Sequence, residues 1–125
     1  DSIRIKEAFP INIGIDFEII ALPNFNSNEV LRNCTTALQS YFNIDEWQVN
    51  EPIILRDVYA QLDNVQGVQT VKNIEFTNKT GGSYSNYKYD VAGAMINNVI
   101  YPSIDPMVFE VKYPNSDITG KVVNL

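Results

Sequence analysis

Asp16 and Glu18 are the first residues whose types and spacing could do chemistry. Two carboxylic acids suffice for glycoside hydrolysis, in which one donates a proton and the other acts as base or nucleophile. The two acids are two positions apart in an alternating run, so they share the polar face of a strand. Such a pair is usually the solvated side of a sheet, and we favour this interpretation. We therefore rank a carboxylate-dependent hydrolase last of three functional hypotheses, after the structural role and the binding module described below.

The chain lacks the residues that most other kinds of active site require. The chain has no histidine and one cysteine, so it holds neither a Ser-His-Asp nor a Cys-His arrangement. A zinc site would have to combine Cys34 with carboxylates, which is an improbable ligand set. Thr80-Gly81-Gly82-Ser83 lacks the lysine and the helix start of a phosphate loop, and we interpret it as a loop tip. We therefore expect no catalytic residue, no cofactor, no metal and no enzymatic activity.

Composition and charge argue against nucleic acids and membranes as binding partners. The 125 residues are 45% hydrophobic and 19% charged, which is typical of one globular domain. The net charge is -6 and the nine Lys and Arg are thinly spread, so we expect no nucleic acid partner. No run approaches the ~18 apolar residues of a membrane helix, so we expect no membrane partner. The chain begins at Asp1 instead of Met, so residues 1–125 are expected to be one domain of a longer protein.

Strict alternation predicts a strand over residues 11–19, with one buried face and one wet face. The wet face would carry Asn12, Gly14, Asp16 and Glu18. Ile3 and Ile5 indicate a short extension, interrupted near Pro10.

Two amphipathic helices are expected next. Capping residues at 26–29 and an apolar stripe predict a helix over 27–43, with Cys34 on its buried face as a small hydrophobe. A second helix is expected from near Asn50, with Pro52 in its first turn, to Asn64 and Gly67. Trp47 lies between the helices. It either anchors the turn, which we favour, or faces a partner.

The second half of the chain indicates several strands. Residues 68–76 predict a strand with a bulge near Lys72-Asn73, and residues 77–83 a loop. A return strand from Tyr84 to Val91 would complete a long hairpin. Alternation predicts another strand over residues 107–113. Residues 99–101 form a short apolar run and residues 118–123 a short terminal segment. The fold class expected is α+β, with a small, mainly antiparallel sheet and two helices packed on one face.

Five tyrosines fall in this half, and two explanations for them stay open. Aromatic residues are enriched in protein interfaces, but they are also favoured in strands. The five are Tyr84, Tyr87, Tyr89, Tyr101 and Tyr113.

Two regions resemble a known family. LRDVYAQL at 55–62 and VQGVQTV at 65–71 resemble the helix-to-strand passage of baseplate J-like proteins. YPSIDPMVFEVKYP at 101–114 and SDITGKVV at 116–123 are similar to the C-terminus of the baseplate wedge subunits of T-even-type contractile-tailed phages.

This resemblance implies a structural role in the virion, in the tail baseplate, after assembly in the host cytoplasm. Copies of such wedge subunits associate and form a ring that joins neighbouring wedges, and the C-terminal domain supplies one self-contact. The resemblance thus implies a homodimer, with other baseplate wedge proteins bound elsewhere on the subunit. It brings no catalytic residues.

A ring of identical subunits needs self-complementary patches. We place the patch in or near Tyr101, Met107, Phe109 and Tyr113, although these alternating residues could instead face the core. The alternative function is a carbohydrate- or receptor-binding module of a phage tail, for which exposed tyrosines and the glycine-rich loop would serve. A solvent-facing aromatic platform would favour that alternative.

Overall fold

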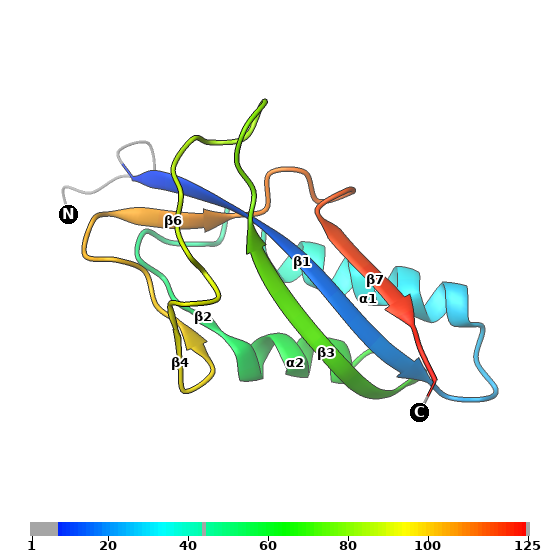
Figure 1. The fold of residues 1–125 in the computed structure, drawn as a ribbon. Helices are drawn as coiled ribbons and strands as arrows, with labels where there is room; N and C mark the ends of the chain where they lie inside the picture. Colours follow the sequence, from blue (N-terminus) through cyan, green and yellow to red (C-terminus); the bar gives the residue numbers. More distant parts are fainter. Residues whose placement is uncertain (1–7, 44, 125) are drawn as a thin grey trace.

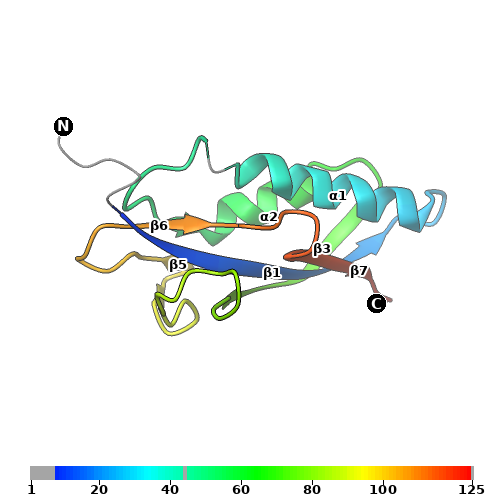
Figure 2. The ribbon, with the colours of Figure 1, turned by 90° about the horizontal axis from the view of Figure 1, so that it is seen from above.

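The computed structural model describes residues 8–43 and 45–124. The extension predicted at Ile3 and Ile5 lies outside these residues. The fold is α+β, with both helices on one face of the main sheet (Figure 2), which confirms the predicted class. The elements, drawn in Figure 1, are β1 (Phe9–Ala21), α1 (Ser27–Tyr41), β2 (Ile53–Ile54), α2 (Leu55–Asp63), β3 (Val68–Asn78), β4 (Met95–Ile96), β5 (Val99–Ile100), β6 (Met107–Glu110) and β7 (Ile118–Val122).

β1 is the centre of the main sheet. One edge pairs with β3 in the antiparallel sense, which is the longest ladder of the fold. The other edge pairs in parallel with β6 along residues 9–12 and with β7 along residues 15–19. The N–H groups of Phe9 and Ile15 donate to Pro106 O and Asp117 O, while Asn12 O accepts from Lys79. The backbone N–H and C=O groups of odd and even residues of a strand point to opposite edges. Since Phe9 and Ile15 are both odd, β6 and β7 follow one another along the same edge of β1.

The strand prediction for 11–19 is confirmed and extended at both ends. Pro10 does not interrupt β1, because β3 reaches only as far as Ile13 and no ladder bond is lost at the proline. The predicted bulge is also confirmed. Glu18 faces Asn73 and Ile19 faces Val71, which leaves Lys72 as the extra residue.

The core lies between the helices and the odd-numbered face of β1. α1 contributes Val30, Cys34 and Leu38, and α2 contributes Val58 and Leu62. These meet the fully buried side chains of β1, which are Ile11, Ile13, Ile15, Phe17 and Ile19. Alternation along one strand and 3.6-residue spacing along two helices therefore produce a single core.

α1 agrees with its prediction to within two residues at its C-terminus. Asn26 caps its start by accepting the Glu29 N–H at 3.0 Å. Trp47 is the anchor that the sequence favoured, since it is 4% exposed, stacks on Phe42 and donates its indole N–H to Tyr41 O at 2.9 Å.

The predicted start of the second helix is wrong. Asn50 has a positive φ of 64°, which stops helical geometry there, and α2 begins only at Leu55. Ile53 and Ile54 instead form β2, which pairs with Ile100 and Val99 of β5. β-branched residues favour such pairing. With β4, these strands make a second, three-stranded sheet.

The predicted return strand from Tyr84 to Val91 is wrong, and so is the long hairpin. Residues 84–90 contain no regular secondary structure. Side chains take the place of a strand partner, since the N–H of Ser85 donates to Asn12 Oδ1 and that of Tyr89 donates to Asn78 Oδ1. The strand predicted at 107–113 also ends early, at Glu110.

Candidate interaction surface

The tyrosine-rich segment, defined as residues 83–89, lies on the face of the sheet opposite the helices. Figure 2 shows this part of the chain, in yellow-green, on the other side of β1 from α1 and α2. It covers Asn12, which is 1% exposed, whereas Asp16 further along the same face is exposed. The prediction that Asn12 faces water is therefore wrong, because alternation could not reveal a third layer over half of the strand.

Asn12 joins three parts of the chain by hydrogen bonds. Its Nδ2 donates to Glu110 Oε1 at 2.7 Å, and its Oδ1 accepts the Ser85 N–H at 2.7 Å. Its backbone oxygen accepts from the N–H of Lys79 and from Asn78 Nδ2. A buried amide with its donors and acceptors used in this way fixes the segment against β1 and β6.

Tyr84 and Asp117 make the second attachment. The Tyr84 hydroxyl donates to Asp117 Oδ1 at 2.8 Å. This hydrogen bond, together with partial burial and the charge of Asp117, raises the pKa of Tyr84. Asp117 is 5% exposed, and its Oδ2 finds no hydrogen-bond partner among the described residues.

The five tyrosines noted in the sequence all lie in irregular structure, so strand preference does not explain them. Tyr113 donates its hydroxyl to Ser83 Oγ at 2.6 Å and packs edge-on against Tyr84. Tyr89 donates its hydroxyl to Tyr101 O. These contacts surround the segment with aromatic side chains that remain partly accessible.

A cleft of about 620 Å³ opens beside the segment. Its walls are residues 83–87 together with Pro10, Asn12, Glu110 and Lys112. The Tyr87 ring stacks on Phe9, with ring centroids 4.5 Å apart and an angle of 26° between the planes. Both rings stay accessible, at 48% for Tyr87 and 37% for Phe9. No local sequence pattern predicts this pair, because Phe9 and Tyr87 are far apart in the chain.

The four residues predicted for a self-contact separate into two groups. Met107 and Phe109 are 4% and 2% exposed, so both are core residues of this chain and offer no surface. Tyr101 and Tyr113 are 46% and 38% exposed and remain available. The loop after Tyr101 also presents Ile104, which is 98% exposed and which sequence reasoning did not single out.

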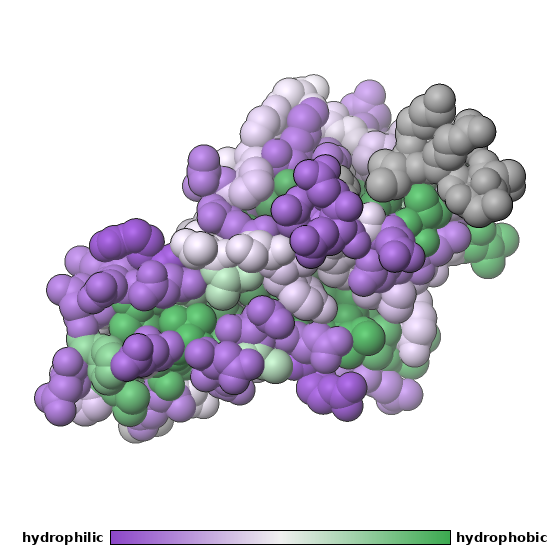
Figure 3. Space-filling view, turned by 180° about the vertical axis from the view of Figure 1, so that it is seen from behind, coloured by the Kyte–Doolittle hydropathy of each residue, from purple (hydrophilic) through white to green (hydrophobic). Residues whose placement is uncertain are grey.

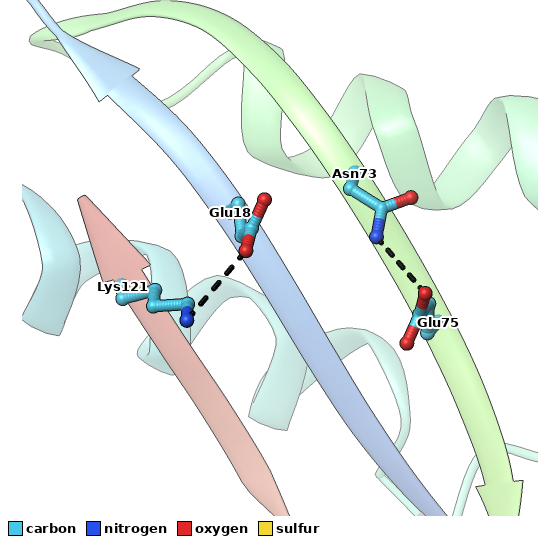
Figure 4. A network of polar contacts seen from close by, with 4 residues as sticks. All are labelled: Glu18, Asn73, Glu75 and Lys121. Carbon is cyan, nitrogen blue, oxygen red and sulfur yellow. Dashed lines mark hydrogen bonds and ion pairs between the residues drawn. The ribbon is translucent and has the colours of Figure 1, made fainter. Parts of the chain in front are cut away.

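The uncovered half of the same sheet face is polar. Figure 4 shows Glu18 beside Lys121 at 3.7 Å and Asn73 donating to Glu75 at 3.2 Å. Asp16 and Glu18 share this face, as predicted. Among the described residues, no three acidic or cysteine side chains come together in a group that could hold a metal ion.

Cys34 is fully buried in α1, as the helical pattern predicted. Burial raises the pKa of its thiol to about 11. A nucleophilic cysteine needs a lowered pKa and access to solvent, so Cys34 has the properties of a structural residue.

The described residues on the helix side are mostly polar at the surface (Figure 3). Figure 3 shows this side from behind as mostly hydrophilic, with hydrophobic side chains in separate small areas. The partly accessible aromatic side chains of the tyrosine-rich segment lie on the opposite side of the molecule (Figure 2).

Comparison with models of protein families and with the sequences of curated proteins found no match for this chain. Neither helix in the described ranges is long and apolar enough to cross a membrane.

Proposed function

We propose that this chain is a structural component of a contractile phage tail baseplate wedge, where it makes subunit-subunit contacts that join wedges into a ring. The similarity of residues 101–114 and 116–123 to baseplate wedge subunits supports this proposal. In it, the domain self-associates as a homodimer, contacts other wedge proteins in the virion and has no enzymatic activity. It binds neither nucleic acid nor membrane.

The loop of residues 101–106 carries the proposal. It connects β5 to β6 and presents two large apolar side chains, Tyr101 at 46% and Ile104 at 98% exposure. The Ser103 hydroxyl accepts the N–H of Asp105 at 3.2 Å, which holds the turn that carries Ile104 outward. Burying an isoleucine side chain is worth about 1.5–3 kcal/mol. A second subunit that covers this loop would recover that free energy.

Tyr113 belongs to a separate patch. It lies on the other side of β6 along the chain, in the turn where Ser116 and Asp117 both donate their N–H to Tyr113 O. Gln39 of α1 contacts the same turn through Pro114 O at 3.0 Å. The turn is therefore held by α1 independently of the 101–106 loop, and each patch can be tested alone.

Light scattering on the purified chain tests the proposal. The wild-type chain is expected to show a mass that rises with concentration from 14.1 kDa toward twice that value. The double variant Tyr101→Ser/Ile104→Ser should shift the dimer dissociation constant upward by at least about tenfold, because two apolar anchors are lost. Tyr113→Ser reports on the second patch.

Leu22→Ser is the matched control. Leu22 is 38% exposed and lies in the connection between β1 and α1, away from both patches. It should leave the dissociation constant unchanged, and circular dichroism should show the same fold in all variants. Unchanged association in both patch variants would exclude these patches as the self-contact.

A further inference from the structure

The cleft beside the tyrosine-rich segment is a hollow with an aromatic wall. Its volume of about 620 Å³ falls within the ~300–1,000 Å³ usual for small-ligand sites. It is open and mixed in character, with rings on one side and hydroxyl, amide and charged groups on the other. This combination suits a ligand that has both an apolar face and many hydroxyl groups.

The aromatic wall is a platform of fixed orientation. Phe9 supports the Tyr87 ring from β1, while the Tyr87 N–H donates to Ser85 Oγ at 3.2 Å. Nearly half of Tyr87 is nonetheless accessible. The electron-rich face of an aromatic ring attracts weakly positive C–H groups. The C–H face of a pyranose ring is such a surface, and stacking on a held ring costs little side-chain entropy.

Glu110 supplies a positioned acceptor. Asn12 holds its Oε1 at 2.7 Å, and no described residue donates to Oε2. Glu110 is partly exposed and lines the cleft, so its carboxylate can accept hydrogen bonds from the hydroxyl groups of a ligand. Hydrogen bonds to a carboxylate are about twice as strong as neutral ones. Asn86 adds an exposed amide, which can both donate and accept.

The charges of the cleft indicate a neutral ligand. Glu110 and Lys112 are its two ionised side chains and offset one another. Lys112 already donates to Ser83 O and lies 5.7 Å from the centre of the Tyr113 ring, so it is occupied within the protein. An anionic ligand would have to compete for this ammonium group.

We infer that this cleft binds a neutral saccharide, with a pyranose ring on Tyr87 and its hydroxyl groups on Glu110 and Asn86. This inference is independent of self-association through the 101–106 loop, because neither Tyr101 nor Ile104 lines the cleft. Tyr113, in contrast, bonds to Ser83 in the cleft wall.

Titration of the ¹⁵N-labelled chain with four neutral oligosaccharides tests the inference. The probes are maltotriose, cellotriose, triacetylchitotriose and lactose. At least one should shift the backbone amide signals of residues 83–87, with a dissociation constant of about 1 mM, as expected for one stacked ring and a few hydrogen bonds. Tyr87→Ala should weaken binding by at least about tenfold, and Glu110→Gln should weaken it while keeping the contact with Asn12.

Two control variants separate the contribution of the Tyr87 ring from other effects of mutation. Tyr87→Phe keeps the ring and should keep the affinity, and Lys88→Ala changes an exposed neighbour outside the cleft and should have no effect. The inference is wrong if none of the four probes shifts these signals, or if binding survives in Tyr87→Ala. Binding of an aromatic dipeptide without any saccharide would assign the cleft to protein docking and would also overturn it.

Discussion

Tyr84 attaches the tyrosine-rich segment to the start of β7 through one hydrogen bond to Asp117. The bond requires a neutral phenol, because ionised Tyr84 would place a second negative charge beside the carboxylate. The other carboxylate oxygen of Asp117 is buried without a described partner. The Tyr84 hydrogen bond is therefore the main side-chain interaction that offsets the cost of burying Asp117.

Tyr84→Phe should lower stability in a pH-dependent way. The raised pKa means that the neutral form is favoured on folding. The stabilisation is therefore fully present below the ordinary tyrosine pKa of about 10 and is lost as pH rises through the raised value. We expect the urea midpoint of the wild type to exceed that of the variant from pH 7 to about pH 10, and the gap to shrink above that.

The difference between the wild type and Tyr84→Phe isolates Tyr84, because the other tyrosines titrate in both proteins. The pKa values of Tyr41 and Tyr89 are also raised, in both cases mainly by burial, but they titrate in the wild type and the variant alike. A gap between the two urea midpoints that stays constant through the alkaline range would contradict the role given to the Tyr84–Asp117 bond.

At the scale of elements, the pairing of β7 with β1 depends on a glycine. Gly120 faces Phe17 across the parallel ladder, and a Cβ at this position would overlap the Phe17 ring. Phe17 is among the largest fully buried side chains, so the ring has little room to move.

Gly120→Ala should destabilise the fold by about 1–3 kcal/mol, because it overpacks the core at the ladder. Urea unfolding measures this cost. Thr119→Ala is the matched control, since Thr119 is the exposed neighbour in the same strand and should change stability by less than about 0.5 kcal/mol.

Phe17→Leu shortens the side chain that Gly120 accommodates. The cost of Gly120→Ala should therefore be smaller in the Phe17→Leu background than in the wild type. Equal costs in the two backgrounds would show that the Phe17 ring is not what excludes a side chain at 120.

The elements that sequence patterns predicted best are those whose partners are local or periodic. β1, α1 and the bulge at Lys72 followed from alternation, helical spacing and a change of parity. The start of α2 and the fate of Tyr84–Val91 did not, because both depend on distant partners. Ile53 pairs with Ile100, and Ser85 bonds to Asn12 across 73 positions of the chain. No local pattern encodes such contacts.

The candidate surfaces were predictable only in part, for a related reason. Of the tyrosines of the second half, Tyr87, Tyr101 and Tyr113 are exposed, so they remain candidates for a contact. Met107 and Phe109 were misleading because β6 is buried on both faces, with Val108 between them only 3% exposed. Alternation predicts a wet side only where one face is uncovered. Phe9 and Ile104 matter because of where the fold puts them, beside Tyr87 and at the tip of a loop.

For the whole molecule, the two free edges of the main sheet bear on assembly. β3 forms one edge, and β6 and β7 follow one another along the other. Each of these strands pairs only with β1 among the described strands. β3 carries two register irregularities and an exposed lysine at 72, and β7 is five residues long. Bulges, lysine and short strands are devices that discourage edge-to-edge pairing. The proposed self-contact therefore relies on side chains of the 101–106 loop instead of an extended sheet.

Sedimentation equilibrium of the unmodified chain, from about 10 µM to about 1 mM, tests self-association most directly, since that range covers dissociation constants typical of weak to moderate dimers. The proposal predicts a mass that rises with concentration from 14.1 kDa toward twice that value and stops there. A closed twofold contact uses one patch on each subunit, which is why no larger species should form. A mass that stays at 14.1 kDa up to the highest concentration would contradict the account.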